Sequence, residues 1–291
     1  MITIENKLLK AGFNEKGAET ASLIDKSLNT QLIWQSEERS WKGQAYNLFP
    51  VIGRLNNGKY IAEGKEYESA VHGFARNSEF KVVKKTKTMV MFLLSHSEET
   101  LKVYPYKFNL FIKYTLLGSR LVTKYIVENT DDKTIYFGIG GHPGFTVPAK
   151  ETGSETDISG NKLIFEKKET PVRFIFDQSK ILIIGEKPYG EVKEIKLSKA
   201  LFSEDAILLK GLKSKYVILA RADGVKIKFR FRKSNALAFW TKLPYGAFLC
   251  IEPWCGVPDR LNKTTDIKHK EGYKKLLAGK KFECGYTIEI M

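Results

Sequence analysis

The sequence has no apolar segment long enough to cross a membrane. None of its hydrophobic runs approaches the roughly 20 residues that a membrane-spanning helix needs. The opening segment, MITIENKLLKAGFNEKGAET, also lacks the basic and then apolar pattern of a secretory signal. These absences predict a cytoplasmic protein that has no membrane partner.

Motifs for metals and cofactors are also missing. The three cysteines, Cys250, Cys255 and Cys284, cannot form a fully paired disulfide framework, which fits a reducing compartment. No Cys-x-x-Cys or His-x-x-x-His spacing suggests a metal site, and the chain has no Gly-rich phosphate loop or nucleophile elbow. We therefore expect no metal and no cofactor.

Strand-like segments recur along the 291 residues, which are 43% hydrophobic and 12% aromatic. Alternating apolar and polar runs are separated by turn sequences such as LNNGKY (55–60) and RADGVK (221–226), and no linker, strong repeat or shift in composition divides the chain. Many alternating strands must bury one face against a second sheet. The pattern predicts a single all-β domain over residues 1–291, a large antiparallel β-sandwich.

Two segments have the composition of short helices. In SEETLKVYP (97–105), Ser97 is a candidate N-cap and Pro105 would end the helix. In EGYKKLLAGKK (271–281), a second helix would end near Gly279. All other elements are expected to be strands or loops.

The net charge of +15 raises nucleic acid as a partner, because lysine and arginine neutralise phosphates. The basic residues are spread along the chain without a long cluster. In VKIKFRFR (225–232) they alternate with apolar residues, which is typical of a strand with one cationic face exposed to solvent. We therefore expect no nucleic-acid partner, although an anionic sugar phosphate would also suit a basic protein.

One histidine lies where the pattern predicts the end of a strand. In YFGIGGHPGF (136–145), Gly140 and Gly141 permit a tight turn, and Pro143 fixes the backbone directly after His142. The imidazole is therefore expected on a constrained backbone at a strand end. Taken alone, such a histidine is better explained by a structural hydrogen bond.

Two more turn segments carry cationic or titratable groups. Arg54 precedes a hairpin expected around Asn57-Gly58. In AVHGFARN (70–77), His72 precedes a glycine and Arg76 follows four residues later. Each of these groups in isolation is typical of a surface ion pair or a backbone hydrogen bond.

A carboxylate occupies the expected end of another apolar run. Glu252, in FLCIEPWC (248–255), is followed by Pro253 and Trp254. A carboxylate in such surroundings is either satisfied by backbone donors or available for chemistry. A tryptophan such as Trp254 is more often part of the core, although an aromatic ring beside a carboxylate also suits the apolar face of a pyranose.

The order of these motifs resembles that of the aldose 1-epimerase (galactose mutarotase) family over nearly the whole chain. The HGFAR, GGHPGF and CIEPW forms resemble a divergent bacterial branch of that family. The matching positions are Arg54, Gly58, Gly64, Tyr67, His72, Gly73, His142, Asp205, Glu252, Pro258, Asp259 and the closing segment LLAGKKFECGYTIEI (276–290).

The resemblance implies a galactose-mutarotase-like supersandwich with the sugar in an open groove on one sheet. It implies that Glu252 acts as the base and His142 as the acid. Arg54, His72 and Asp205 would hold the sugar hydroxyls. We therefore expect these side chains to converge on one groove, although they are far apart in the sequence.

The residues alone support the same chemistry. Exchanging the anomers of an aldose requires a base at the anomeric hydroxyl and an acid at the ring oxygen, and then the reverse when the ring closes. A glutamate is ionised near neutral pH, and a histidine can be protonated when a carboxylate lies close to it. No metal, nucleotide or covalent intermediate is needed. The expected activity is therefore that of an isomerase acting on a hexose or hexose phosphate.

Three alternatives remain open at this stage. A non-catalytic sugar-binding or regulatory protein could keep the groove without proton transfer. A hexose-phosphate mutarotase would need extra cations at the groove, for which Arg76 is a candidate. A glycosidase would need a second carboxyl group opposite Glu252, with Asp205 or Asp259 as candidates.

Overall fold

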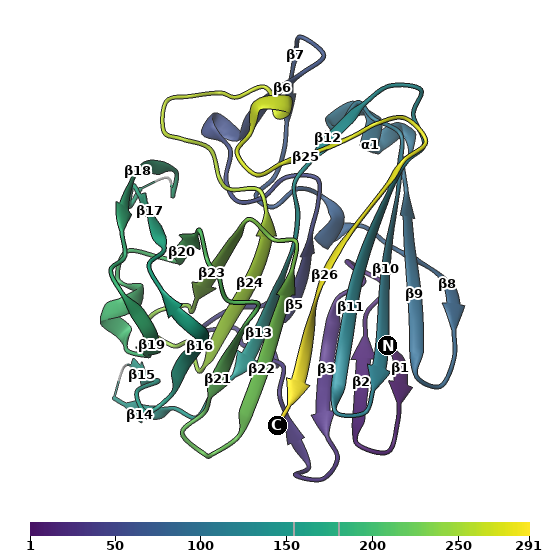
Figure 1. Cartoon of the computed structure of the whole chain (residues 1–291). Coiled ribbons are helices and arrows are strands. Elements are labelled where there is room, and N and C mark those ends of the chain that lie inside the picture. Colours follow the sequence, from purple (N-terminus) through teal and green to yellow (C-terminus); the bar gives the residue numbers. More distant parts are fainter. Residues whose placement is uncertain (154, 180) are drawn as a thin grey trace.

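Two large antiparallel sheets form the body of the protein (Figure 1). The computed structural model describes residues 1–153, 155–179 and 181–291. The nine-stranded sheet has the spatial order β19 (Val192–Lys196), β16 (Lys162–Glu169), β21 (Tyr216–Ala220), β22 (Lys226–Arg232), β26 (Lys281–Ile290), β11 (Arg120–Asn129), β10 (Phe108–Leu117), β9 (Met89–Ser95) and β8 (Lys81–Lys85). The seven-stranded sheet has the order β18 (Ile183–Pro188), β17 (Val172–Phe176), β20 (Ile207–Lys210), β23 (Ala236–Trp240), β24 (Phe248–Cys255), β13 (Ile139–Thr146) and β5 (Ala45–Leu48).

Smaller elements surround these sheets. A four-stranded sheet contains β1 (Ile2–Glu5), β2 (Leu9–Phe13), β3 (Thr20–Asp25) and β4 (Thr30–Gln31). Three further strand pairs are β6 (Lys59–Ala62) with β7 (Lys65–Glu68), β12 (Ile135–Phe137) with β25 (Lys274–Leu276), and β14 (Lys150–Thr152) with β15 (Glu155–Asp157). The helical elements are α1 (Glu98–Val103) and the 3₁₀ turns η1 (Asn56–Gly58), η2 (Ala75–Asn77), η3 (Lys199–Phe202) and η4 (Ile267–His269). Among the described residues, no helix is both long and apolar enough to cross a membrane.

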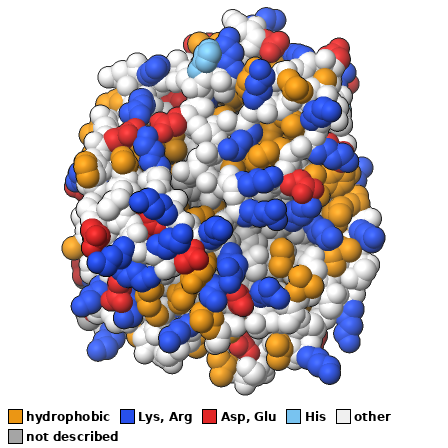
Figure 2. All heavy atoms as spheres, viewed as in Figure 1, with side chains coloured by type: hydrophobic (Ala, Val, Ile, Leu, Met, Phe, Trp, Pro, Cys, Tyr) orange, Lys and Arg blue, Asp and Glu red, His pale blue; other side chains and the backbone are white. Residues whose placement is uncertain are grey.

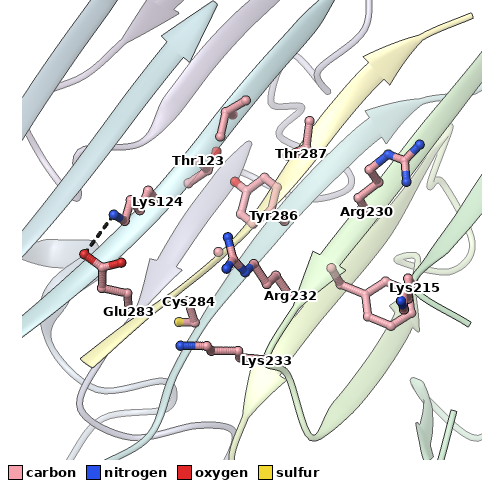
Figure 3. Close-up of a pocket in the computed structure, with 13 residues that line it drawn as sticks. Thr123, Lys124, Lys215, Arg230, Arg232, Lys233, Glu283, Cys284, Tyr286 and Thr287 are labelled. Atoms are coloured by element: carbon pink, nitrogen blue, oxygen red, sulfur yellow. Dashed lines mark ion pairs between the residues drawn. The ribbon is translucent and has the colours of Figure 1, made fainter. Parts of the chain in front are cut away.

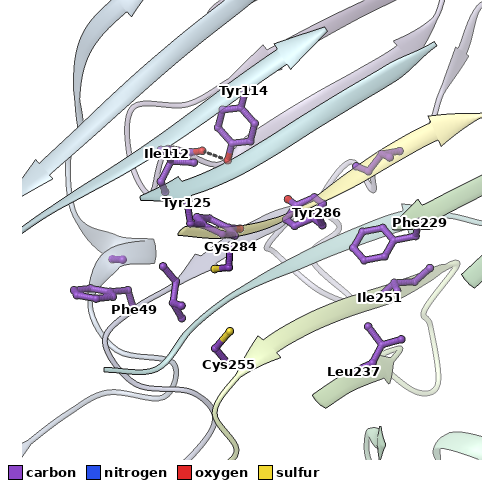
Figure 4. Packing of buried hydrophobic residues seen from close by; sticks show 14 of the residues in the cluster. Phe49, Ile112, Tyr114, Tyr125, Phe229, Leu237, Ile251, Cys255, Cys284 and Tyr286 are labelled. Carbon is purple, nitrogen blue, oxygen red and sulfur yellow. Dashed lines mark hydrogen bonds between the residues drawn. The ribbon is translucent and has the colours of Figure 1, made fainter. Parts of the chain in front are cut away.

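The main core lies between the two large sheets, as the alternating strand pattern predicts. On β10, alternate residues from Phe108 to Leu116 are buried, and their neighbours are half-exposed. Aromatic pairs join the sheets: the rings of Phe145 on β13 and Phe229 on β22 lie 6.0 Å apart. Figure 4 shows Ile251 and Leu237 of one sheet packed near Phe229 of the other. The antiparallel all-β sandwich is therefore confirmed.

One of the two expected helices is present and the other is wrong. Ser97 caps α1 by accepting a hydrogen bond from the Thr100 backbone N–H. The segment 271–281 instead contains β25, in which Leu276 is buried opposite Ile135 of β12. Pairing with β12 and burial of Leu276 outweigh the moderate helix propensity of the lysine- and leucine-rich segment.

The expected strand ends at His142 and Glu252 are also wrong, because β13 and β24 run straight through these residues. The glycines before His142 are needed for close packing. A Cβ at Gly140 would lie 2.7 Å from the Pro253 carbonyl oxygen, and one at Gly141 would lie 2.6 Å from the Tyr286 ring. Both catalytic candidates are therefore held in the middle of strands.

The first expected hairpin is displaced by a few residues. Asn57 and Gly58 belong to the 3₁₀ turn η1, and the hairpin that follows joins β6 to β7. Its turn residues, Glu63 and Gly64, have φ values of 51° and 73°. Two successive positive φ values match the right-handed twist of paired strands, which explains why the turn forms there.

The strand expected over 225–232 is confirmed as β22, with its cationic residues on the outer face. Ile227 and Phe229 are buried, whereas Lys226, Arg230 and Arg232 are exposed. Figure 2 shows lysine and arginine side chains gathered across the middle of the molecular face that contains this part of the chain.

A buried polar network ties the two large sheets together. The Asn47 side-chain amide on β5 donates to the carbonyl oxygens of Gly17 and Ala18, at 2.9 and 3.0 Å. Tyr125 on β11 donates to Asn47 Oδ1 at 2.7 Å, and Tyr114 on β10 donates to the Ala18 carbonyl at 2.8 Å. Because all these groups are removed from water, each depends on its partner.

We expect Asn47→Ala to lower the free energy of unfolding by about 2–4 kcal/mol, since it leaves several buried groups without partners. Tyr125→Phe removes a single hydroxyl and should cost about 1 kcal/mol. Urea unfolding followed by circular dichroism measures both effects. Equal costs for the two substitutions would contradict the central position of Asn47.

Candidate active site

The site starts from one row of side chains across four strands of the seven-stranded sheet. His142 on β13 is paired with Tyr46 on β5, and Glu252 on β24 is paired with Ala238 on β23. His142 Nε2 lies 3.1 Å from Glu252 Oε2. Ile251, the neighbour of Glu252, belongs to the core between the sheets, so this row faces the opposite side.

Glycines beside His142 make room for two indole rings. A Cβ at Gly144 would lie 2.7 Å from the Trp41 ring, and one at Gly140 would lie 2.8 Å from the Trp254 ring. The Trp41 ring centroid is 4.9 Å from that of His142. The His142 imidazole thus packs against Trp41. A residue larger than glycine at position 140 or 144 would collide with one of the two indole rings.

The loop between β7 and η2 supplies His72. The His72 backbone has a φ of 65°, and its N–H donates to the Gly53 carbonyl at 3.0 Å. In return the Gly53 N–H donates to His72 Nδ1 at 3.1 Å, which leaves Nε2 as the protonated nitrogen of the neutral ring. Burial lowers the pKa of His72 well below its usual value, and the nearby His142, Arg76 and Arg54 lower it further. His72 is therefore a neutral hydrogen-bond donor.

The structure brings all seven residues expected at the site to one cavity of about 200 Å³. This volume is below the roughly 300–1,000 Å³ of most drug-sized ligand sites and suits a small molecule such as a monosaccharide. Trp254 is buried, Arg54 is exposed, and Asp205 is half-buried. The seven lining residues are Arg54, His72, Arg76, His142, Asp205, Glu252 and Trp254.

Two cationic groups border this cavity. The Arg76 guanidinium carbon lies 5.2 Å from the centroid of the Tyr46 ring, and its Nε has no hydrogen-bond partner among the described residues. Arg54 has no carboxylate within ion-pair distance in the described part of the chain. Both side chains are available to polar groups of a ligand.

Apart from Trp254, sequence reasoning missed the large aromatic residues of the lining, which are Trp41, Tyr46, Trp240 and Phe176. Trp41 lies in the polar segment RSWKGQ (39–44), where a large aromatic residue has no obvious core to join. That mismatch is a signal that could have identified it. Tyr46 and Trp240 lie within ordinary strand patterns, so only the register reveals that they face the cavity.

Asp259 has a structural role instead of a place opposite Glu252. Its Oδ1 pairs with the Lys270 ammonium, and both side chains are buried. Its Oδ2 accepts a hydrogen bond from the Asn56 backbone N–H at 3.1 Å. Since both oxygens are engaged, Asp259 is not available as the second carboxyl group of a glycosidase.

Burial controls the protonation of the central pair. It raises the pKa of the Glu252 carboxyl well above its usual value; nearby Asp205 adds to this rise, and the Trp254 indole opposes it. Burial also lowers the pKa of His142 to about 3, with a smaller contribution from the Arg76 cation. Both shifts favour the uncharged pair, a protonated Glu252 carboxyl beside a neutral His142 imidazole. The Glu252 Oε2 atom is buried and, apart from its contact with His142, has no hydrogen-bond partner among the described residues.

A thiol lies close to the same pair. One ligand atom each from His142, Cys250 and Glu252 lie within 4.8 Å of one another, so they could approach a single metal ion. Burial raises the pKa of the Cys250 thiol well above its usual value, and Glu252 raises it further, which disfavours the thiolate that binds metals. Cys250 packs with Trp34 and Phe248 in an apolar cluster. We assign Cys250 to packing.

The β-sandwich and this cavity define a protein of the galactose mutarotase-like class. The family model for aldose 1-epimerase matches residues 1–287, and the chain belongs to this family.

Several relatives match the chain over its whole length. It is 31% identical to the plasmid-encoded protein LacX of Lactococcus lactis subsp. lactis, with 100% of this chain and 99% of LacX covered. A galactose mutarotase related enzyme from Lactobacillus acidophilus is 32% identical with a TM-score of 0.92, over 100% of this chain and 97% of that chain. A galactose mutarotase-like protein from Lactobacillus casei is 30% identical with a TM-score of 0.93, and both chains are covered completely.

Glu252→Gln should stabilise the protein, and more at pH 8 than at pH 5. Above the ordinary carboxyl pKa of 4.5 the unfolded chain releases a proton that folded Glu252 retains, so stability falls as the pH rises toward the raised pKa. Glutamine removes this loss. Below pH 6.5 the unfolded chain binds a proton that folded His142 does not, so the remaining histidine still causes a loss toward acid pH.

Urea unfolding at pH 5, 6.5 and 8 measures this difference. Glu68→Gln, at an exposed position on β7, is the matched control and should give the same small effect at every pH. A benefit of Glu252→Gln that does not grow with pH would mean that the buried carboxyl is ionised in the folded protein.

Proposed function

We propose that this protein interconverts the α and β anomers of a hexose or hexose phosphate. The observation that carries the proposal is the contact of 3.1 Å between His142 Nε2 and Glu252 Oε2 beside a monosaccharide-sized cavity. The anomeric hydroxyl and the ring oxygen of an aldose are bonded to the same carbon. An acid and a base that serve both oxygens must therefore lie close together, as these two groups do.

The proposed reaction uses one proton shared by this pair. Transfer of that proton from Glu252 to His142 produces the carboxylate base and the imidazolium acid. Glu252 then takes the proton of the anomeric hydroxyl while His142 protonates the ring oxygen, and the ring opens to the aldehyde. Rotation about the bond between the first two carbons and closure with reversed roles give the other anomer. Each group is expected to contribute about 10²–10⁴ to the rate.

The remaining residues of the cavity would bind the sugar. Neutral His72 would donate through Nε2 to a hydroxyl oxygen, and Asp205 would accept from a hydroxyl group. Trp254 and Trp41 offer rings to the apolar face of a pyranose. Arg54 and Arg76 would hold hydroxyl groups or, in a hexose phosphate, the phosphate.

A second candidate function is sugar binding without turnover. Its support is the protonation of the pair, because burial disfavours the carboxylate and imidazolium forms that the reaction needs. The two functions differ only in proton transfer, so they predict the same ligands and different rates.

A screen of aldoses and their 6-phosphates by NMR exchange spectroscopy tests the proposal, because this method detects anomer exchange directly. We expect faster exchange for at least one sugar, and the same rate in the presence of a chelator. Binding of a sugar without any acceleration would replace the enzymatic function with the binding function.

Substitutions should separate proton transfer from sugar binding. Glu252→Gln and His142→Asn are each expected to lower kcat by about 10² or more, with sugar still bound. Their combination should cost much less than the product of the single effects, since each proton transfer requires the other group. Arg54→Ala should act mainly on KM, because a grip on a hydroxyl is similar in the ground and transition states.

Glu68→Gln, outside the cavity, is the control for these kinetic measurements and should match the unaltered protein. Near-normal kcat in Glu252→Gln would remove the catalytic role from this pair. A fall in kcat with unchanged KM in Arg54→Ala would instead bring Arg54 into the chemistry.

A further inference from the structure

A second cavity lies on the outer face of the nine-stranded sheet, away from the sugar site. Its volume is about 550 Å³, within the range of roughly 300–1,000 Å³ that is usual for small-molecule sites. It lies over the central strands β22, β26 and β11 (Figure 3). None of its lining residues belongs to the lining of the sugar cavity.

A glycine creates the hollow. Gly285 on β26 is paired with Lys124 on β11 and with Arg232 on β22, so the middle of this row has no side chain. Gly285 has a φ of 152°, and a Cβ there would lie 2.1 Å from the Thr123 carbonyl oxygen. The position therefore excludes every larger residue, and the long side chains of Lys124 and Arg232 stand on either side of it. Neighbouring strands are about 4.8 Å apart, which puts the two backbones roughly 10 Å from each other.

The next row provides an apolar surface beside this hollow. Thr287 on β26 is paired with Val122 on β11 and with Arg230 on β22. Val122 and Thr287 are half-exposed on the same face as the hollow. A ligand that covers both rows would contact cations at its edges and a methyl-rich surface below its body, which suits an organic anion.

The cations of this cavity outnumber its carboxylates. The five cationic lining residues are Lys124, Lys215, Arg230, Arg232 and Lys233, whereas Glu283 is the acidic one. Lys124 pairs with Glu283 at 2.8 Å, and Arg230 Nε lies 3.5 Å from Glu289. In the described part of the chain, Lys215, Arg232 and Lys233 have no carboxylate within ion-pair distance.

The free cations lie on more than one side of the hollow. Figure 3 shows Lys124 on one side of Arg232, and Arg230 and Lys215 on the other side. Lys233 lies next to Cys284. The pKa of Glu283 is lowered first by its hydrogen bond to Lys124, and Lys233 and Arg232 lower it further, so their charges reach the same space. A single inorganic phosphate could contact only some of these cationic side chains at one time.

We propose that this cavity is a second ligand site, for a small organic molecule that carries two or more phosphate groups. Guanidinium groups bind phosphate oxygens in pairs, and the ammonium groups add charge. The recessed shape and the nearby Glu283 and Glu289 carboxylates favour a compact ligand over a nucleic-acid strand, which binds along an open basic groove with exposed aromatic platforms.

Isothermal titration calorimetry of the full chain at physiological ionic strength tests this site, with fructose 1,6-bisphosphate as the probe and inorganic phosphate for comparison. We expect one bisphosphate to bind in this cavity and inorganic phosphate to bind there much more weakly. Arg232→Gln should weaken bisphosphate binding by about tenfold or more, because it removes a charge-assisted hydrogen bond to a phosphate group.

Lys226→Gln is the matched control, since it removes one charge from the same strand and face outside the cavity. It should change the affinity by no more than about twofold, as expected for a screened exposed charge. Equal weakening by both substitutions would reduce the effect to general electrostatics and overturn the proposal, as would no binding at all.

Two further measurements locate the ligand. Arg54→Ala should leave bisphosphate binding unchanged, and a loss there would move the ligand to the sugar cavity and overturn the second site. A single-stranded oligonucleotide should not displace the bisphosphate, and tight displacement would identify a nucleic-acid surface instead. Because none of these readouts uses anomer exchange, they stand or fall independently of the proposed enzymatic function.

Discussion

The pairing of β13 with β24 is the constraint on which the site depends. The register sets His142 opposite Glu252 and, on the next strands outward, Tyr46 and Ala238 beside them. A slip of β13 by one residue would turn His142 into the core, and the same slip of β24 would replace Glu252 on the outer face by Ile251. The buried network around Asn47 opposes such a slip, because it anchors β5, the neighbour of β13, to the other sheet.

Side-chain size on the same strands then shapes the space around the pair. Gly140 and Gly144 admit two indole rings, and Ala238 leaves room beside Glu252. The same principle acts on the opposite sheet, where Gly285 opens the cationic hollow. In the first place indole rings fill the space that the glycines leave, and in the second the space stays open, but neither glycine interrupts its sheet.

Much of the fold was predictable because strands of a sandwich carry a local signal. Alternation identified β22, and the capping residue Ser97 identified α1. The errors fall where tertiary contacts decide. Segment 271–281 becomes β25 because β12 is available to pair with it, and the glycines before His142 reflect neighbouring rings and carbonyl groups that lie far away in the sequence.

The sequence by itself determined the all-β class, the family resemblance and the identity of the residues that line the sugar cavity with polar groups, since motif order and alternation are properties of the chain. Only the tertiary structure decided that His142 and Glu252 touch in mid-strand, that Asp259 is held by Lys270, and that Trp41 and Tyr46 complete the cavity. It also decided that the cationic face of β22 borders a hollow. The physical reason is that register, burial and the resulting pKa shifts arise from neighbours on other strands, which no local pattern encodes.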